Sequence, residues 1–242
     1  MTSLQLLLDV LRDHISRVAP EAIEATATKP HIVVRWWRYR RIHQLLGFKF
    51  WAFVVGGAPL DPELEEFWSR LGFLVVQGYG LTETAPIVTL NHPFRARQGT
   101  VGTPLGGVEV RIAKDGEILV RGQNVTSGYY KAPKETAAAF QDGWFHTGDV
   151  GALDAAGRLT VRGRKKDVIV TPEGLNVFPE DVERVLREVL GVHDAAVVGV
   201  VHNGQERVHA VVIVDPGVET TSVIREANAR LEDHQRIRGC SI

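Results

Sequence analysis

The first ninety residues alternate between helical and strand-like patterns of hydrophobic residues. Apolar positions within 4–18 recur at the spacing of an amphipathic helix. Buried strands are predicted at 50–55 and 73–77, and the helix between them is predicted to begin at Pro62 with Asp61 as its cap. Strands that alternate with helices indicate a layered α/β unit.

The middle of the chain has a different pattern of hydrophobic and turn residues. Short segments at 108–112, 117–120 and 158–161 are separated by turns that contain Gly and Asp. Several short strands with such turns are typical of a small antiparallel sheet or a barrel-like element.

The C-terminal segment is predicted to be a small α/β unit. Its strands are expected at 167–170, 195–201 and 208–214. A helix that buries apolar residues from Val182 to Leu190 is expected to end at Gly191. A last helix is predicted from about Ser222 to beyond Leu231, after which the chain ends.

These patterns predict a mixed α/β (α+β) fold in three parts. The expected divisions are a layered α/β unit at 1–95, a β-rich unit at 96–165 and a small α/β unit at 166–242.

Charge and cysteine content exclude several classes of protein. The 28 Lys and Arg residues nearly cancel the 29 Asp and Glu residues, and the net charge of -1 lacks the basic excess of a general nucleic-acid binder, so no nucleic-acid partner is expected. The single cysteine, Cys240, cannot form an intrachain disulfide. We therefore expect a reducing, cytoplasmic compartment.

One basic and aromatic stretch, Arg35–Arg41, stands apart from this balance. The favoured interpretation is a helix whose aromatic rings pack inward while its arginines stay solvated. Arginines interleaved with aromatic rings also suit stacking on nucleic-acid bases. A third interpretation is peripheral contact with an anionic membrane.

The segment from Gly78 to Thr84, directly after a predicted strand, combines groups that suit a phosphate site. Glycines at a strand end allow a ligand to approach the backbone closely. Thr82 offers a hydroxyl to a phosphate oxygen, Glu83 offers the oxygen ligand that Mg²⁺ prefers, and Tyr79 offers a ring for stacking. The alternative is an ordinary glycine turn before a polar loop.

Two further segments contain candidate ribose ligands. Asp149 follows a Thr-Gly turn, and its carboxylate suits both hydroxyls of a ribose, unless it is only a turn residue. Arg164 offers a fork of donors to ribose or phosphate oxygens, or else belongs to a solvated basic turn.

Taken together and in order, these motifs resemble those of the adenylate-forming enzymes, which include acyl-CoA synthetases, peptide-synthetase adenylation domains and luciferases. The resemblance covers nearly the whole chain and rests on Gly56–Pro59, Gly78–Glu83, Thr147–Asp149 and Gly163–Asp167. Within that family, Gly174–Glu183 is most similar to the corresponding loop of long-chain fatty-acid–CoA ligases.

The resemblance implies a role for each matching residue. Gly57, Ala58 and Tyr79 would border the adenine of ATP or AMP, with Gly80 in the same nucleotide-binding turn. Thr82 would contact phosphate.

Further roles follow from the same likeness. Glu83 would bind Mg²⁺, and Asp149 and Arg164 would hold the ribose. Lys166 would be the hinge between a large and a small domain, and Gly174 would lie in the loop that reaches the active site for thioester formation.

Two parts of the family pattern are absent from the sequence. No Ser/Thr/Gly-rich phosphate loop occurs between Met1 and Ala52, and no lysine follows Lys166. We therefore expect an internal fragment with both ends cut, which forms little acyl-adenylate alone and would work with the N-terminal part of the same enzyme.

The expected function is that of an acid–thiol ligase. The resemblance implies ATP-dependent activation of a long-chain fatty acid with Mg²⁺, followed by acyl transfer to CoA. Two alternatives are a nucleotide-binding or regulatory module without catalysis, and adenylation of an aryl or amino acid for a carrier protein.

Overall fold

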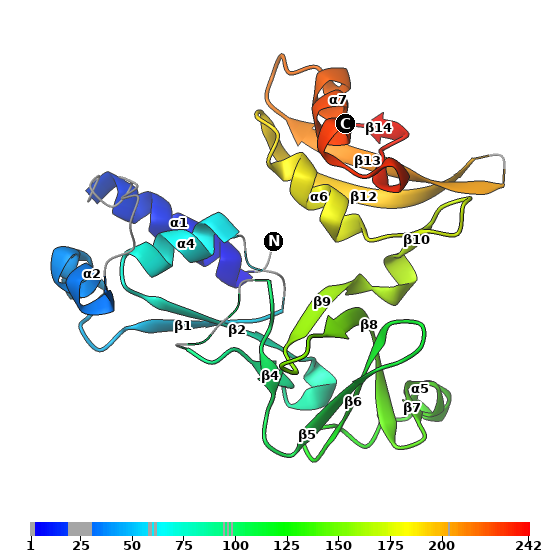
Figure 1. The fold of residues 1–242 in the computed structure, drawn as a ribbon, viewed down its shortest axis with the longest axis horizontal. Coiled ribbons are helices and arrows are strands. Elements are labelled where there is room, and N and C mark those ends of the chain that lie inside the picture. The colour runs from blue at the N-terminus through cyan, green and yellow to red at the C-terminus, as the bar shows by residue number, and fades with distance from the viewer. Residues whose placement is uncertain are drawn as a thin grey trace. The chain divides into compact units, whose positions relative to one another are not determined.

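The computed structural model describes residues 3–18, 31–57, 60, 62–93, 95, 97, 99–202 and 204–242 (Figure 1). The expected adenine contact Ala58 and the expected helix cap Asp61 lie outside these residues.

The chain forms two compact units. Unit 1 comprises Met1–Arg111, Leu119–His146 and Leu153–Thr160, and unit 2 comprises Ile112–Ile118, Thr147–Ala152 and Val161–Ile242. The division into 1–95, 96–165 and 166–242 expected from the sequence stays a prediction.

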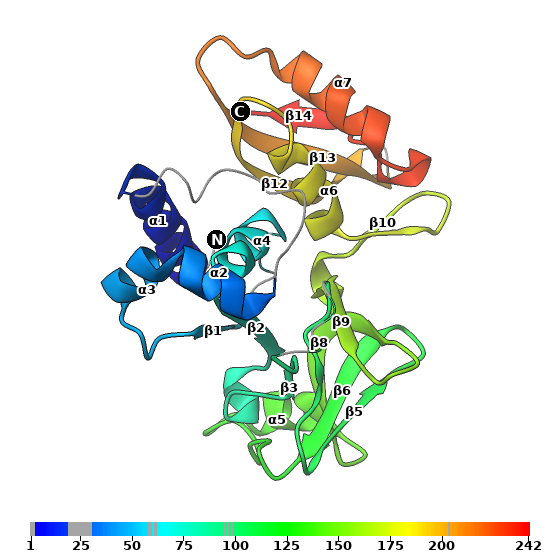
Figure 2. The ribbon, with the colours of Figure 1, turned by 60° about the vertical axis from the view of Figure 1, so that its left-hand side comes forward.

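Unit 1 begins with helices around two parallel strands. The elements are α1 (Ser3–Val18), α2 (Ile32–Arg38), α3 (Arg40–Leu46), β1 (Ala52–Val55), α4 (Pro62–Arg70) and β2 (Leu74–Tyr79). β1 and β2 pair in parallel, and α1 and α4 lie on the same side of this pair (Figures 1 and 2). The layered α/β unit predicted from the sequence is confirmed. None of the helices in the described ranges is long and apolar enough to cross a membrane.

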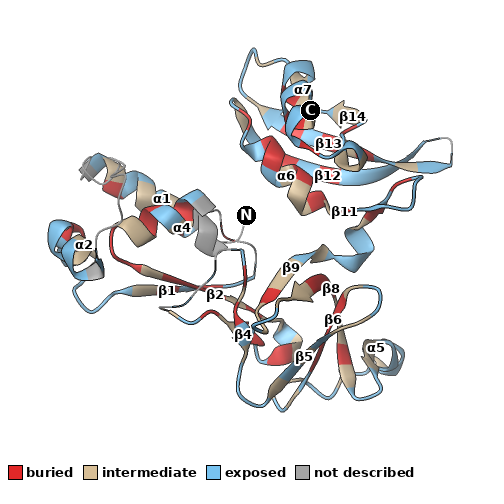
Figure 3. Ribbon diagram, in the orientation of Figure 1, coloured by how far each residue is buried: buried red, intermediate tan, exposed pale blue. Residues whose placement is uncertain are grey.

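Aromatic and aliphatic side chains of α4 and its neighbours form the core of this layer. Leu64 and Trp68 are fully buried, at the four-residue spacing that puts them on one face of α4. The Trp68 ring lies 4.7 Å from the ring of Phe53 and 5.6 Å from that of Phe73, measured between centroids. Figure 3 shows the buried parts of α4 in red. Burial of such side chains anchors the strand ends that follow.

Two short strands extend the sheet beyond β2. β3 (Thr89–Leu90) pairs antiparallel with β2, and β4 (Thr103–Pro104) pairs with β3. A 3₁₀ turn, η2 (Thr82–Thr84), lies between β2 and β3.

A second sheet contains β5 (Val108–Ile112), β6 (Glu117–Gly122), β7 (Phe140–Gln141), β8 (Trp144–Leu153) and β9 (Leu159–Arg164). Their order is β5-β6-β8-β7, with β9 beside β8, and α5 (Pro133–Ala139) precedes β7. β5, β6 and β9 confirm the predicted β element. The pattern missed β8 because Gly148, Asp149 and Gly151 are poor strand formers.

The C-terminal part of unit 2 contains a second set of strands and helices. In chain order these are η3 (Lys165–Asp167), β10 (Ile169–Val170), β11 (Asn176–Val177), α6 (Pro179–Arg187), β12 (Val192–His202), β13 (Gln205–Val214), α7 (Thr220–Arg230), η4 (Asp233–Gln235) and β14 (Gly239–Ser241). β12 and β13 form an antiparallel pair, and β14 runs parallel to β13. Apolar side chains of α6 and α7 pack with those of β12 and β13 in one core.

Three local expectations for this part were wrong. Asp167 belongs to the 3₁₀ turn η3 rather than to a strand. Leu190 is 93% exposed, because α6 ends at Arg187 and the helical spacing no longer applies at 190. The chain does not end as a helix, since the Asn228 side chain binds both the N–H and the C=O of Ile237 and turns the chain into β14.

Candidate functional site

The carboxyl ends of β1 and β2 meet at one edge of the first sheet. A Cβ atom placed on Gly56 would lie 3.3 Å from the carbonyl oxygen of Gly78, so the two strand ends are in contact. The next residue, Gly57, is exposed and has a φ of +90°, which favours glycine. Open α/β sheets bind ligands at this edge. The structure therefore brings Gly57 close to the predicted Gly78–Glu83 segment.

Tyr79 and Gly80 lie at the end of β2. The Tyr79 side chain is buried, and its carbonyl accepts a hydrogen bond from the Val88 N–H at 2.8 Å. A Cβ atom at position 80 would collide with the carbonyl oxygen of Pro86. Gly80 is thus required by close packing of the chain on itself, a reason that we did not foresee.

The next two residues present polar side chains beyond this strand end. Thr82 is exposed and Glu83 is half-buried on the 3₁₀ turn η2. The Tyr129 hydroxyl donates to Glu83 Oε1 at 3.0 Å, and the Thr126 N–H donates to the Glu83 carbonyl at 2.8 Å. The Tyr129 bond therefore orients the Glu83 carboxylate, while the Thr126 bond holds the Glu83 backbone.

Tyr129 is a site residue that sequence reasoning missed. Burial raises its pKa, and so does its bond to Glu83. In the same segment, Asn124 Nδ2 donates to the carbonyls of Thr84 and Ile87 at 2.9 and 3.0 Å. No local pattern linked Tyr129 to Glu83, because the two residues lie 46 positions apart in the sequence.

The chemistry of Glu83 fits a magnesium ligand. Mg²⁺ commonly takes one or two protein carboxylates and completes its shell with water and substrate phosphates. Among the residues that the structure describes, no three His, Cys, Asp or Glu side chains form a cluster for a metal ion. A single carboxylate beside the exposed Thr82 hydroxyl suits a metal that arrives with a nucleotide.

Asp149 and Arg164 form an ion pair within unit 2. The Asp149 side chain on β8 is 7% exposed, and its Oδ1 lies 3.0 Å from Arg164 Nε at the end of β9. Arg164 Nη1 also donates to the carbonyl of Thr147 at 3.2 Å. The two predicted ribose ligands are therefore brought together, and a carboxylate beside a guanidinium provides both acceptors and donors for hydroxyl groups.

The turn that presents Asp149 is fixed by its own hydrogen bonds. Thr147 Oγ1 donates to the carbonyl of Ile118 at 2.7 Å and accepts from the Asp149 N–H at 3.1 Å. Glu117 Oε1 accepts from the Gly148 N–H at 3.0 Å. Sequence reasoning missed Glu117, because one Glu at a strand start carries no signal of its own.

Lys166 and Gly174 lie in separate segments after β9. Lys166 is exposed in η3, which joins β9 to β10. Gly174 has a φ of +79° in the turn between β10 and β11, where its N–H donates to the Thr171 carbonyl at 2.8 Å. No other atom lies within 4 Å of a Cβ atom built on Gly174, so this turn has space beside it.

The Arg35–Arg41 stretch is divided between inward and outward aromatic rings. Tyr39 is buried, and the Trp36 ring contacts the His43 ring at a centroid distance of 5.0 Å. Trp37 is 71% exposed, and the guanidinium of Arg40 lies 5.3 Å from the centroid of its ring.

Residues 8–130, about half of the chain, match the model of a protein family described as AMP-binding enzyme. The chain is 44% identical over 178 residues to the long-chain-fatty-acid–CoA ligase FadD15 of Mycobacterium bovis, an alignment that covers 74% of this chain and 29% of the relative. It is 40% identical over 148 residues to the 2-succinylbenzoate–CoA ligase of Listeria monocytogenes, covering 60% of this chain and 32% of the relative.

A solved structure with the same fold is O-succinylbenzoate coenzyme A synthetase (MenE) from Bacillus subtilis, in complex with ATP and a magnesium ion. The TM-score is 0.73 at 32% identity, and the match covers 78% of this chain and 42% of that chain. The chain thus spans about a third of the length of the sequence relatives that it matches.

Proposed function

The chain belongs to the AMP-binding enzyme family, and we propose that its residues serve the ATP-dependent activation of a carboxylic acid and its transfer to CoA. The observation that carries this proposal is the buried Asp149 carboxylate held by Arg164 at 3.0 Å. A fixed carboxylate of this kind binds ribose hydroxyls in nucleotide-binding folds.

The proposed reaction has two steps. An oxygen of the substrate carboxylate attacks the α-phosphorus of ATP, forming an acyl–phosphate bond while pyrophosphate leaves. The CoA thiol, losing its proton, then attacks the acyl carbon, forming a thioester while AMP leaves. Neither step needs a covalent bond to the protein, so the protein contributes positioning and charge stabilisation.

The residues of this chain would divide that work. Asp149 and Arg164 orient the nucleotide through its ribose, and the Thr82 hydroxyl donates to a phosphate oxygen. Glu83, held by Tyr129, is the residue that would hold Mg²⁺. The metal would supply charge neutralisation at the phosphates.

We infer that the acid is a long-chain fatty acid. The support is the 44% identity to the ligase named for long-chain fatty acids, against 40% over a shorter stretch for the ligase named for 2-succinylbenzoate. The segment Gly174–Glu183 supports the same assignment, because its sequence resembles the corresponding loop of long-chain fatty-acid–CoA ligases.

A pair of chimaeras tests both parts of the proposal. In each, this chain replaces the matching segment of one relative, the M. bovis fatty-acid ligase or the L. monocytogenes succinylbenzoate ligase. Acid-dependent exchange of pyrophosphate into ATP is then measured. We expect exchange with palmitate in the first host, its loss on Glu83→Gln, and little exchange with succinylbenzoate in the second host.

Other results would overturn specific parts. Exchange only in the second host would contradict the fatty-acid assignment. Binding of AMP without exchange in either host would favour a nucleotide-binding module without catalysis. A Glu109→Gln change is the control for Glu83→Gln, because Glu109 lies on the exposed face of β5 and pairs with Arg121.

We also propose that the α2–α3 segment contacts an anionic membrane surface. Between Glu24 and Asp61 the sequence holds no acidic residue, and Trp37 and Val33 are exposed at 71% and 66%. Apolar rings among arginines suit a headgroup interface. Co-sedimentation with phosphatidylglycerol vesicles should fall in Trp37→Ser and at high salt. Equal sedimentation of the variant would contradict the contact.

A further inference from the structure

Glu117 is a buried carboxylate that binds two segments of unit 2 at once. It is the first residue of β6, and its side chain is 7% exposed. Oε1 accepts the N–H of Gly148 at 3.0 Å, and Oε2 lies 3.0 Å from Nζ of Lys165. A carboxylate withdrawn from water is stable as an anion when donors reach both of its oxygens, and here both are reached.

The two partners of Glu117 are the neighbours of the proposed ribose ligands. Gly148 precedes Asp149, and Lys165 follows Arg164. Gly148 has a φ of +70°, so its turn is left-handed, and the bond to Glu117 fixes the direction of its N–H. One carboxylate therefore restrains both sides of the Asp149–Arg164 pair.

Asp115 strengthens the hold on Lys165. Its Oδ2 lies 2.7 Å from Lys165 Nζ, and its Oδ1 accepts the N–H of Glu117 at 3.2 Å. The bond to Lys165 lowers the pKa of Asp115, and the bonds to Asp115 and Glu117 raise the pKa of Lys165. These pKa shifts favour the charged forms of Asp115 and Lys165 at neutral pH. Lys165 is thus anchored directly before Lys166.

We propose that Glu117 is a positioning residue for the nucleotide ribose, which keeps Asp149 and Arg164 in register by binding Gly148 and Lys165 together. This inference rests on the proposed function, since it assigns the ribose to that pair. Loss of the Glu117 charge removes one of the two carboxylates that hold Lys165 and so loosens the segment that presents Arg164. The affinity for a nucleotide with intact ribose hydroxyls should then fall.

Two nucleotides that differ only in those hydroxyls separate positioning from general stability. Isothermal titration of the purified chain with AMP and with 2′,3′-dideoxy-AMP gives the preference for an intact ribose. We expect Glu117→Gln and Lys165→Met each to weaken AMP binding by about tenfold, the loss of one charge-assisted bond. Binding of 2′,3′-dideoxy-AMP should stay unchanged, so the preference for AMP falls.

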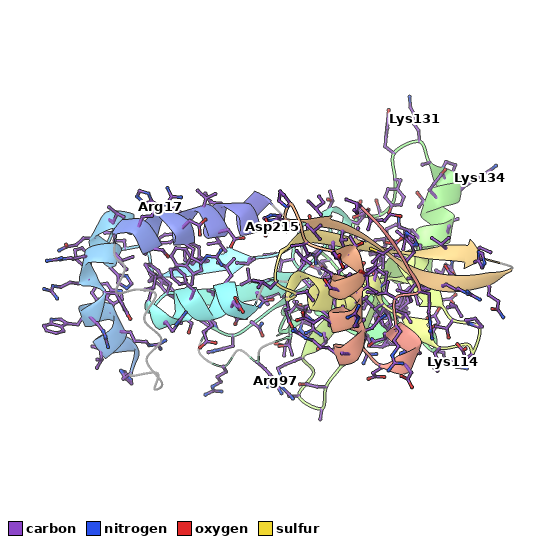
Figure 4. All side chains as sticks on the ribbon, turned by 90° about the horizontal axis from the view of Figure 1, so that it is seen from above. Arg17, Arg97, Lys114, Lys131, Lys134 and Asp215 are labelled. Atoms are coloured by element: carbon purple, nitrogen blue, oxygen red, sulfur yellow. The ribbon has the colours of Figure 1, made fainter. Side chains whose placement is uncertain are left out.

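Matched controls carry the same chemical changes elsewhere. Glu109→Gln removes a carboxylate that pairs with Arg121 at 2.7 Å on exposed side chains. Lys134→Met removes an ammonium that extends from α5 into solvent (Figure 4). Both controls should keep the wild-type preference for AMP. If Glu117→Gln does not fold, Lys165→Met serves alone, because the Lys165 side chain is 46% exposed and methionine is of similar length.

The outcomes separate this inference from the function that it rests on. A wild-type chain that binds neither nucleotide would refute the proposed function. If the wild-type chain prefers AMP and both variants keep that preference, the positioning role is wrong while the function stands. Equal weakening of both nucleotides would show a general structural role and would also overturn the inference.

Discussion

At the scale of single residues, Asp149 combines burial with a neighbouring cation. Its side chain is 7% exposed and faces Arg164, whose own side chain is 46% exposed. Removing the carboxylate leaves a guanidinium that water can still solvate, so the fold should tolerate the change. The effect should therefore appear in ligand binding more than in stability.

Asp149→Ala should weaken AMP binding by about 1.5–3 kcal/mol, because the carboxylate would make charge-assisted bonds to the ribose. Calorimetric titration of the chain measures this difference. Asp215→Ala is a matched control, because Asp215 pairs with His193 at 2.6 Å on exposed side chains. Equal AMP affinity in the wild-type chain and Asp149→Ala would remove the ribose assignment.

At the scale of elements, the first turn of α6 contains a carboxylate, that of Glu180, with a buried oxygen. Glu180 Oε2 is buried and has no hydrogen-bond partner among the described residues. A Cβ atom on Gly163 would collide with this carboxylate, so backbone of the β9 end packs directly against it. Burial raises the pKa of Glu180 above its ordinary value, and the nearby Glu183, Asp167 and Asp181 add to the rise, while a hydrogen bond to its own backbone opposes it.

The sign of this shift gives a prediction about stability. A pKa raised in the folded state gives stability that is present below the unfolded value and is lost as pH rises through the folded value. The ionised Glu180 therefore destabilises the fold at pH 7. We expect Glu180→Gln to raise the midpoint of thermal unfolding at pH 7 and to leave it unchanged at pH 4.

The exposed Glu188 at the C-terminal end of α6 provides the control, since Glu188→Gln should change neither midpoint. A Glu180→Gln protein that unfolds at a lower temperature than wild type at pH 7 would contradict the origin of the shift.

Elements with a clear hydrophobic period were predictable from the sequence, and those fixed by distant polar contacts were not. The helix at 4–18 and the strand at 108–112 follow from local spacing. β14 depends on the Asn228 side chain binding Ile237 nine residues later, which no local pattern encodes.

The same distinction holds at the candidate site. Asp149 and Arg164 were predicted from short motifs in the sequence, and the structure pairs them. Glu117 and Tyr129 were not predicted, because each acts through a contact that spans more than thirty residues. Sequence motifs identified the residues that we expect to contact the ligand. The residues that hold them in place were found only in the structure.

At the scale of the whole molecule, Lys166 separates an anchored segment from the C-terminal sheet. Lys165 is tied to Asp115 and Glu117, whereas Lys166 is exposed. We therefore propose that rotation between the two steps of the reaction is absorbed at Lys166, since a few residues at the end of an element take up such motions.

Lys166→Pro should slow thioester formation more than adenylation, because proline fixes φ near −65°. Rapid-quench assays of the two half-reactions in the fatty-acid ligase chimaera measure the ratio of their rates. Lys166→Ala keeps φ free, so we expect it to leave that ratio unchanged. An equal loss in both half-reactions of the proline variant would argue against a hinge.

Binding of an adenine nucleotide to this chain is tested most directly by isothermal titration of AMP into the purified chain, at low ionic strength and neutral pH. We expect saturable binding at one site, with a dissociation constant within the range of about 1 μM to 1 mM that is common for the KM values of enzymes. Heats that never exceed dilution at millimolar AMP would contradict the claim.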